Sequence, residues 1–236
     1  WILNPEQKSS IKFMGYQADT VMGEITGMPR VRFNHDQPWQ SNIDFYEFYQ
    51  GVDQVEKPKG YLIPQAWQAV LDRLKTNQVK MEILDNDTTI DVTGYKIKDY
   101  ETYHSAYEGH YPHYQVQLLP EEQTVSFRAG DIYVPVDQNH YRFILETLEP
   151  GAVDSYFNWN FFDAILSLKE YFSSYIFEEK AAEFLDSHPE IRKQLEEKKK
   201  QDSTFAVDKR AQLQFIYEQS PYFEKSYLQY PVYRLE

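Results

Sequence analysis

The sequence has 236 residues, of which 42% are hydrophobic and 17% aromatic, and it contains no cysteine. This composition excludes a disordered chain, because burying so many apolar side chains offsets the entropy lost on folding. The formal net charge of -13 disfavours nucleic acid as a partner, and the lack of cysteine excludes disulfides and thiolate chemistry. No apolar run is long enough for a membrane span, so we expect a folded globular protein.

The first predicted segment, residues 1–58, is rich in β-forming residues. Val, Ile, Phe and Tyr alternate or cluster between Gly, Pro and Asn in residues 11–16, 31–33 and 43–49. Each of these runs is a predicted strand. Residues 52–59, which include a proline, are predicted to be a connector.

The second predicted segment, residues 59–153, contains two units of the same kind: a short apolar strand, a proline and a helix. The first unit is a strand at 60–64 followed by a helix to residue 74. The second is a strand at 130–135 followed by a helix at 140–148. Proline fixes its own φ and holds the preceding residue in extended geometry, so it ends each strand before the helix begins.

Between the two units the sequence predicts further strands. Residues 79–84 and 89–97 carry β-forming residues, with period-two alternation in the second run. Residues 114–119 and 124–128 are predicted to form a hairpin around Pro120. Since helices alternate with strands only sparsely here, we expect a mixed sheet with some antiparallel pairing.

The third predicted segment, residues 154–236, is mostly helical. Apolar residues at helical spacing predict helices over 157–175, 191–200 and 210–217, and the end of the segment, 227–235, is predicted to be extended and to lie back on the body. The predicted fold class is therefore mixed α+β, with a β-rich start, a mixed-sheet middle and a helical C-terminal part. We expect the three segments to pack together as one accessory unit.

The strongest candidate for a metal site is a short loop with two histidines. His110 and His113 are three residues apart, and Glu108 or His104 supplies a third potential ligand. Gly109 and a proline place these residues in a loop, where histidines are more often solvated or hydrogen-bonded than bound to a metal. Glu108, His110 and His113 remain the candidate ligands.

Three other groupings were weighed against simpler interpretations. The pair His35 and Asp36 could work in acid–base catalysis, but adjacent residues of an extended chain point to opposite sides. Glu146 and Glu149 flank a helix end, which favours a solvated helix face over paired catalytic carboxylates. The aromatic run at 156–162 could be a platform on which sugar rings stack, but its spacing favours core packing.

Five stretches of the sequence, taken in order, resemble a known family. They are residues 13–16 (FMGY), 60–64 (GYLIP), 128–135 (RAGDIYVP), 145–150 (LETLEP) and 154–163 (DSYFNWNFFD). In this order they resemble the region that follows the catalytic domain in zinc carboxypeptidase family proteins of the Bacteroidetes type. The resemblance covers roughly residues 10 to 235 and is strongest in the second strand–proline–helix unit and the residues after it.

The resemblance implies that the zinc and the chemistry belong to a catalytic domain absent from this chain. That family binds zinc through an H-x-x-E pair and a distant histidine, and a glutamate acts as general base. No histidine of this sequence is followed by Glu three residues later. The histidines tested are His35, His104, His110, His113, His140 and His188. No catalytic residue can be carried over, so we expect a chain that is no enzyme by itself and has no cofactor of its own.

Two functions follow from this interpretation. The first is an accessory domain that packs on the N-terminal catalytic domain of its own protein and shapes substrate access. The second is a glycan- or peptidoglycan-binding module that tethers the peptidase to its substrate. The resemblance also implies export to the periplasm or the cell surface. The sequence begins at Trp1 rather than Met, so a signal peptide could lie upstream.

Overall fold

The computed structural model describes residues 1–52 and 54–236. The chain divides into two compact units, residues 1–56 and 57–236. The boundary lies inside the connector predicted at 52–59, of which Asp53 is outside the described residues. Sheets and helices are both present, so the predicted mixed α+β class is confirmed.

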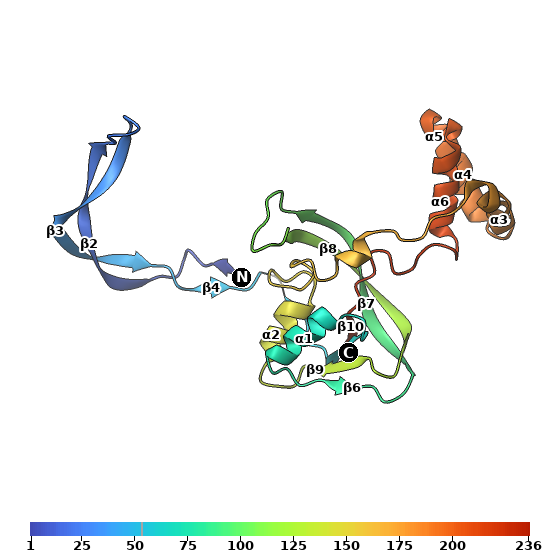
Figure 1. Cartoon of the computed structure of the whole chain (residues 1–236), viewed down its shortest axis with the longest axis horizontal. Helices are drawn as coiled ribbons and strands as arrows, with labels where there is room; N and C mark the ends of the chain where they lie inside the picture. Colours follow the sequence, from blue (N-terminus) through green and yellow to red (C-terminus); the bar gives the residue numbers. More distant parts are fainter. Residues whose placement is uncertain (53) are drawn as a thin grey trace. The chain divides into compact units, whose positions relative to one another are not determined.

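Unit 1, residues 1–56, consists of β-strands alone in its described part. The short strands β1 (Ile2–Leu3) and β4 (Tyr49–Gln50) pair antiparallel, and the long strands β2 (Ser9–Met22) and β3 (Pro29–Phe45) form an antiparallel hairpin. Figure 1 shows this hairpin as a two-stranded ribbon. The strand predicted at 11–16 lies within β2, whereas the separately predicted strand at 31–33 and the first part of the one at 43–49 fall in the single strand β3, which ends at Phe45.

Unit 2, residues 57–236, is built on a six-stranded sheet with the order β6-β9-β5-β10-β7-β8. Every pairing in this sheet is antiparallel, whereas the sequence predicted a mixed sheet for residues 59–153. The strands are β5 (Gly60–Ile63), β6 (Glu82–Ile83), β7 (Thr88–Thr102), β8 (His113–Phe127), β9 (Ile132–Pro135) and β10 (Tyr233–Leu235). The two strand–proline–helix units are confirmed: β5 leads to helix α1 (Gln68–Thr76), and β9 leads to helix α2 (Tyr141–Leu148).

The hairpin predicted around Pro120 is wrong, because β8 runs through this proline without a turn. Pro120 pairs with Tyr95 of β7, within a stretch of continuous register from Thr88 to Ile97. The sheet order places β8 at an edge, with β7 as its neighbour. Proline has no N–H to donate, and an edge strand can hold it because one side of the strand needs no ladder hydrogen bonds.

The helix predicted over 157–175 is also wrong. The chain there forms turns, a short 3-10 helix η1 (Asp163–Leu166) and an extended stretch, and α3 begins only at Ser174. Polar side chains near residue 157 bond to the backbone: Ser155 Oγ accepts from the Asn158 backbone N–H, and Asn158 Nδ2 donates to the carbonyl of Ala152. Such local bonds compete with helical ones.

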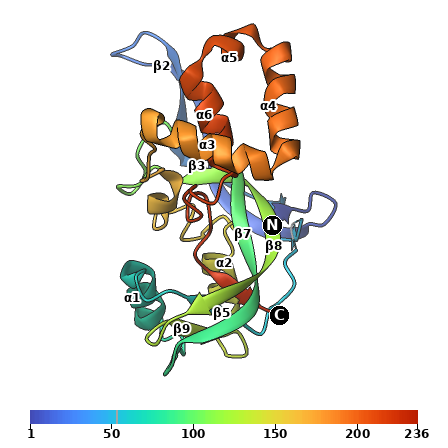
Figure 2. The same cartoon turned by 90° about the vertical axis from the view of Figure 1, so that its right-hand side faces the viewer.

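The remaining helices form a group with its own apolar cluster. They are α3 (Ser174–Ser187), α4 (Pro189–Gln201), α5 (Ser203–Val207) and α6 (Lys209–Gln219). Figure 2 shows them grouped around one another. Phe177, Leu195, Phe205 and Leu213 are among the buried side chains at their centre. The helices predicted at 191–200 and 210–217 are therefore confirmed. No helix in residues 1–52 and 54–236 is long and apolar enough to cross a bilayer.

Of the extended segment predicted at 227–235, only residues 233–235 form a strand, the central strand β10. β10 lies between β5 and β7, where Arg234 pairs with both Tyr61 and Thr93. The side chain of Arg234 is 6% exposed, and its Nη1 lies 2.7 Å from Oε1 of Glu149, which also accepts a 2.5 Å hydrogen bond from the Tyr61 hydroxyl. Burial raises the pKa of Glu149. Hydrogen bonds and the charge of Arg234 lower it, but burial has the larger effect, so the pKa is above its ordinary value. The solvated face predicted for Glu149 is wrong, since this residue is 4% exposed.

Candidate functional site

Unit 2 carries an open pocket of about 730 Å³ whose lining is mostly apolar. Helices α1 and α2 and two loops contribute its lining. The aromatic lining comes from Phe143 of α2 and from Tyr156, Trp159 and Phe161 of the loop before η1. Pockets of about 300–1,000 Å³ with an apolar lining and a few polar groups are typical ligand sites.

A tight turn in the connection from β7 to β8 forms one wall of the pocket. Tyr107 and His110 exchange backbone hydrogen bonds of 2.8 and 2.9 Å, so Glu108 and Gly109 are the two central residues of the turn. Both have positive φ, 50° and 80°, as a two-residue hairpin turn requires. The turn places Glu108 and His110 in the pocket lining.

The aromatic side chains of the pocket pack on one another in a continuous cluster. The ring of His110 stacks on Phe161 at 5.9 Å and meets Trp159 edge-on at 5.7 Å. Tyr107 lies 6.0 Å from Trp159, and Tyr156 meets Phe161 edge-on at 5.3 Å. These contacts restrict the rings that line the pocket, so its apolar wall is largely preformed.

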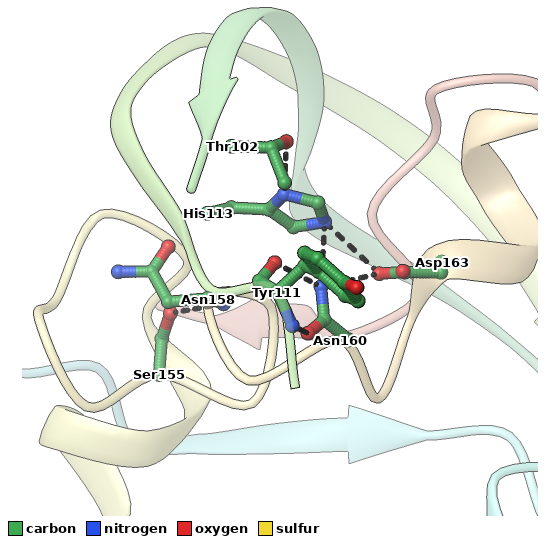
Figure 3. A network of polar contacts seen from close by, with 7 residues as sticks. All are labelled: Thr102, Tyr111, His113, Ser155, Asn158, Asn160 and Asp163. Atoms are coloured by element: carbon green, nitrogen blue, oxygen red, sulfur yellow. Dashed lines mark hydrogen bonds and ion pairs between the residues drawn. The ribbon is translucent and has the colours of Figure 1, made fainter. Parts of the chain in front are cut away.

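Asn160 sets the position of the two aromatic residues that flank it in the sequence. Its Oδ1 accepts a 3.0 Å hydrogen bond from the Tyr111 backbone N–H, and its Nδ2 donates a 2.9 Å bond to the Tyr111 carbonyl. Figure 3 shows the side chain of Asn160 reaching the backbone of Tyr111 next to His113. Asn160 has a φ of 65°, and Asn tolerates this left-handed conformation better than most residues. This clamp holds Trp159 and Phe161 beside His110.

His113 is the buried support of the same clamp. Its Nδ1 lies 2.8 Å from Thr102 Oγ1, and its Nε2 lies 3.0 Å from Asp163 Oδ1 (Figure 3). An ionised carboxylate can only accept, so Nε2 donates to Asp163, and Nδ1 can accept from the Thr102 hydroxyl. Both ring nitrogens are thus used within the fold, and the ring is 5% exposed.

The order hydroxyl, imidazole, carboxylate also occurs in relays that activate a hydroxyl nucleophile. In this chain Thr102 and His113 are directly opposite each other on β7 and β8, and the lining of the pocket does not include Thr102. Asp163 joins them from η1. We assign the three residues a positioning role, because they connect the β7–β8 ribbon to the loop that carries the aromatic wall.

Charged side chains of both signs surround the aromatic wall. The guanidinium of Arg73 lies 4.1 Å from the ring centre of Phe161, in cation–π contact. Arg142 Nε lies 3.7 Å from Glu146 Oε1. Glu108 and Asp154 also line the pocket. Within residues 1–52 and 54–236, neither of these two carboxylates has a hydrogen bond or an ion pair.

The three candidate metal ligands lie in two different environments. Glu108 and His110 line the pocket, whereas both ring nitrogens of His113 are bonded beneath it. No group of three or more His, Cys, Asp or Glu side chains in the described part of the chain is placed to hold a metal ion. His35, far from this site in the sequence, stacks on Tyr16 at 4.4 Å in the hairpin of unit 1.

Sequence reasoning missed the two residues that give the pocket its form and charge, Asn160 and Arg73. An Asn between two aromatic residues signals a break in a helical pattern, because Asn favours the left-handed conformation. Nothing local to Arg73 indicates its contact with Phe161. In the aromatic run Phe157 and Phe162 are fully buried, as core packing predicts, whereas Trp159 and Phe161 are half-buried and line the pocket.

Comparisons of the chain with protein family models, with curated protein sequences and with solved structures find no match.

Proposed function

We propose that this chain is a non-catalytic accessory domain of a secreted zinc-carboxypeptidase-like protein. It would pack on the N-terminal catalytic domain of that protein and shape access to the active site. The resemblance of residues 10–235 supports the family, and the absence of an H-x-x-E pair supports a chain without catalysis of its own. The zinc would belong to the catalytic domain, and the setting would be periplasmic or extracellular.

The observation that supports the docking role is the exposure of large apolar side chains in unit 1. Of residues 1–52 and 54–56, Gly23 alone is buried. A two-stranded hairpin without a covered face is marginally stable in water. Large apolar side chains are nevertheless frequent on it: Met14 is 74% exposed, Phe33 61% and Ile25 97%. A sequence of this kind gains stability when a partner surface covers it.

The cross-strand pairs of the hairpin give it continuous apolar stretches. Ile11 lies opposite Ile43, and the rings of Phe13 and Trp39 are 5.8 Å apart. Phe13 and Trp39 are diagonal neighbours, since Phe13 pairs with Ser41 and Trp39 with Gly15, and all four apolar side chains lie on the same face of the hairpin. Contiguous exposed apolar patches mark protein interaction sites, and aromatic residues are enriched at the centre of interfaces.

The test is hydrogen exchange of the hairpin amides in this chain alone and in the full-length protein that contains the catalytic domain. We expect β2 and β3 to gain protection in the full-length protein. The double variant Phe13→Ser/Trp39→Ser should remove that gain. Val207→Ser is the matched control, since Val207 is 86% exposed on unit 2 and should leave protection of the hairpin unchanged.

Two results would contradict the proposal. If the hairpin amides exchange at the same rate with and without the catalytic domain, this hairpin does not dock on it. If the purified chain binds stoichiometric zinc or cleaves peptides, the chain is not a purely accessory domain. In that case Glu108 and His110 would be the first residues to substitute.

A further inference from the structure

We propose that the aromatic pocket of unit 2 is a saccharide-binding site, in which a pyranose ring stacks on Trp159 and its hydroxyls bond to the charged rim. This function is separate from docking of the unit 1 hairpin, and every residue lining the pocket belongs to unit 2.

The size and the wall of the pocket suit one or two sugar rings. Its volume of about 730 Å³ is within the range of small-molecule sites. The half-buried indole of Trp159 contacts Tyr107 and the edge of His110. A pyranose has an apolar face of C–H groups that can lie flat on an indole, which offers a large and rigid contact surface.

The distribution of charge around the pocket favours a neutral ligand rich in hydroxyls. The rim carries the cations Arg73 and Arg142 and the carboxylates Glu108, Glu146 and Asp154. A ligand with a single charge would meet charges of both signs. A hydroxyl, in contrast, donates to a carboxylate and accepts from a guanidinium, so a polyhydroxylated ring can use both.

Two of the rim carboxylates are open for such bonds. Glu108 and Asp154 have no partner within residues 1–52 and 54–236, and Glu108 is held at the tip of a two-residue turn. Glu146 is already close to Arg142, which orients it. Carboxylate acceptors beside an aromatic wall give a sugar both an orientation and an apolar contact.

The Asn160 clamp makes the site rigid before any ligand arrives. The side chain of Asn160, which lies between Trp159 and Phe161 in the sequence, forms two hydrogen bonds to the backbone of Tyr111. Arg73 covers one face of Phe161, so Phe161 serves as a support and Trp159 as the contact surface. A preformed wall reduces the entropy lost on binding.

The test titrates the 236-residue chain with soluble oligosaccharides and follows binding by calorimetry. The probes are β-linked glucose and N-acetylglucosamine oligomers at up to millimolar concentration. Nα-acetyl-lysine amide, which keeps its charged ε-ammonium group, is the cationic probe. We expect at least one saccharide series to bind. Trp159→Ala should weaken that binding about tenfold or more, because it removes both the buried apolar area of the indole and its ring contact with the sugar.

Controls separate binding from folding. Trp39→Ala in unit 1 is a matched tryptophan control and should bind as the unaltered chain does. The double variant Glu108→Gln/Asp154→Asn changes only exposed side chains and should weaken binding while the thermal unfolding midpoint stays the same. If Trp159→Ala fails to fold, this double variant still tests the site.

Three results would overturn the proposal. The first is that neither saccharide series binds to the folded chain. The second is that saccharide binding is unchanged in both the Trp159 variant and the rim variant. The third is that Nα-acetyl-lysine amide binds and the saccharides do not. The last result would identify the pocket as a site for cationic side chains.

Discussion

The buried ion pair between Arg234 and Glu149 should couple the central strand β10 to the rest of the sheet. Arg234→Met would leave the Glu149 carboxylate in a site where its side chain is 5% exposed, with the Tyr61 hydroxyl as a remaining donor. Removing one partner of a buried pair costs about 3–5 kcal/mol of the free energy of unfolding. Glu149→Leu should cost about 3 kcal/mol, the lower end of this range, because Arg234 still has an ion pair with Glu236, whose Oε1 lies 2.8 Å from its Nε.

The double variant Glu149→Leu/Arg234→Met should be far less damaging than the sum of the two. Both charges are then gone, and the main loss is the acceptor of the Tyr61 hydroxyl, about 1–3 kcal/mol. We therefore expect a coupling free energy of at least about 2 kcal/mol. Urea unfolding of the four proteins at neutral pH, followed by far-UV circular dichroism, measures it. Singles that add up to the double within about 0.5 kcal/mol would refute the coupling.

The pH dependence of Arg234→Met provides a second check on the same reasoning. Burial raises the pKa of Glu149 above the ordinary 4.5, and loss of Arg234 removes a charge that opposed this rise. A carboxyl group whose pKa is raised by folding makes the fold less stable as pH rises through the window between the two values. The deficit of Arg234→Met should therefore shrink as the pH is lowered from neutral toward 4.5. A deficit independent of pH would mean that Glu149 is solvated in the variant.

Three further predictions concern the Asn160 clamp, the contact of Glu224 with Lys169 and the unit 1 hairpin. Asn160→Gly should lose the two hydrogen bonds to Tyr111 and about 1–3 kcal/mol of the free energy of unfolding. Asn160→Ala should lose about 0.5–1 kcal/mol more, because Ala is strained at positive φ. Equal unfolding midpoints of the two variants would contradict the strain. Hydrogen bonds from Ser226 and from the Lys169 backbone N–H lower the pKa of Glu224 to about 2, so its stabilising effect is complete above pH 4.5 and lost as pH falls toward 2. The amide shift of Lys169 should titrate with a midpoint near 2, and a midpoint near 4.5 would contradict this. Limited proteolysis of the chain alone should cut residues 1–52 before unit 2, and the order should be checked by mass spectrometry of the fragments.

The parts of the fold that depend on neighbouring residues could be predicted from the sequence. Pro64 and Pro135 restrict the backbone locally, so both strand–proline–helix units were found. Pro120 obeys the same rule, but its effect depends on whether its strand lies at an edge. That property is set by the order of strands far apart in the sequence, so a turn was predicted in place of one continuous strand.

The sequence indicated some residues of the candidate site but not how they are arranged. The loop with Glu108 and His110 and the aromatic run were both identified, yet nothing in the sequence indicates that they face each other. Asn160 brings them together by bonding to Tyr111, a partner 49 residues away. Glu149 was taken as a solvated helix end because its partner Arg234 lies 85 residues further along the chain.

The central place of β10 also affects how the protein is made. β5 pairs with β10 on one side, so residues 60–62 leave the ribosome long before their partners at 233–235 exist. Until then the backbone edges of β5 and β7 that β10 will join are unpaired, and such edges invite aggregation during synthesis. The sheet can close only after residues 233–235 have been translated, which predicts slow, late completion of folding dominated by non-local contacts.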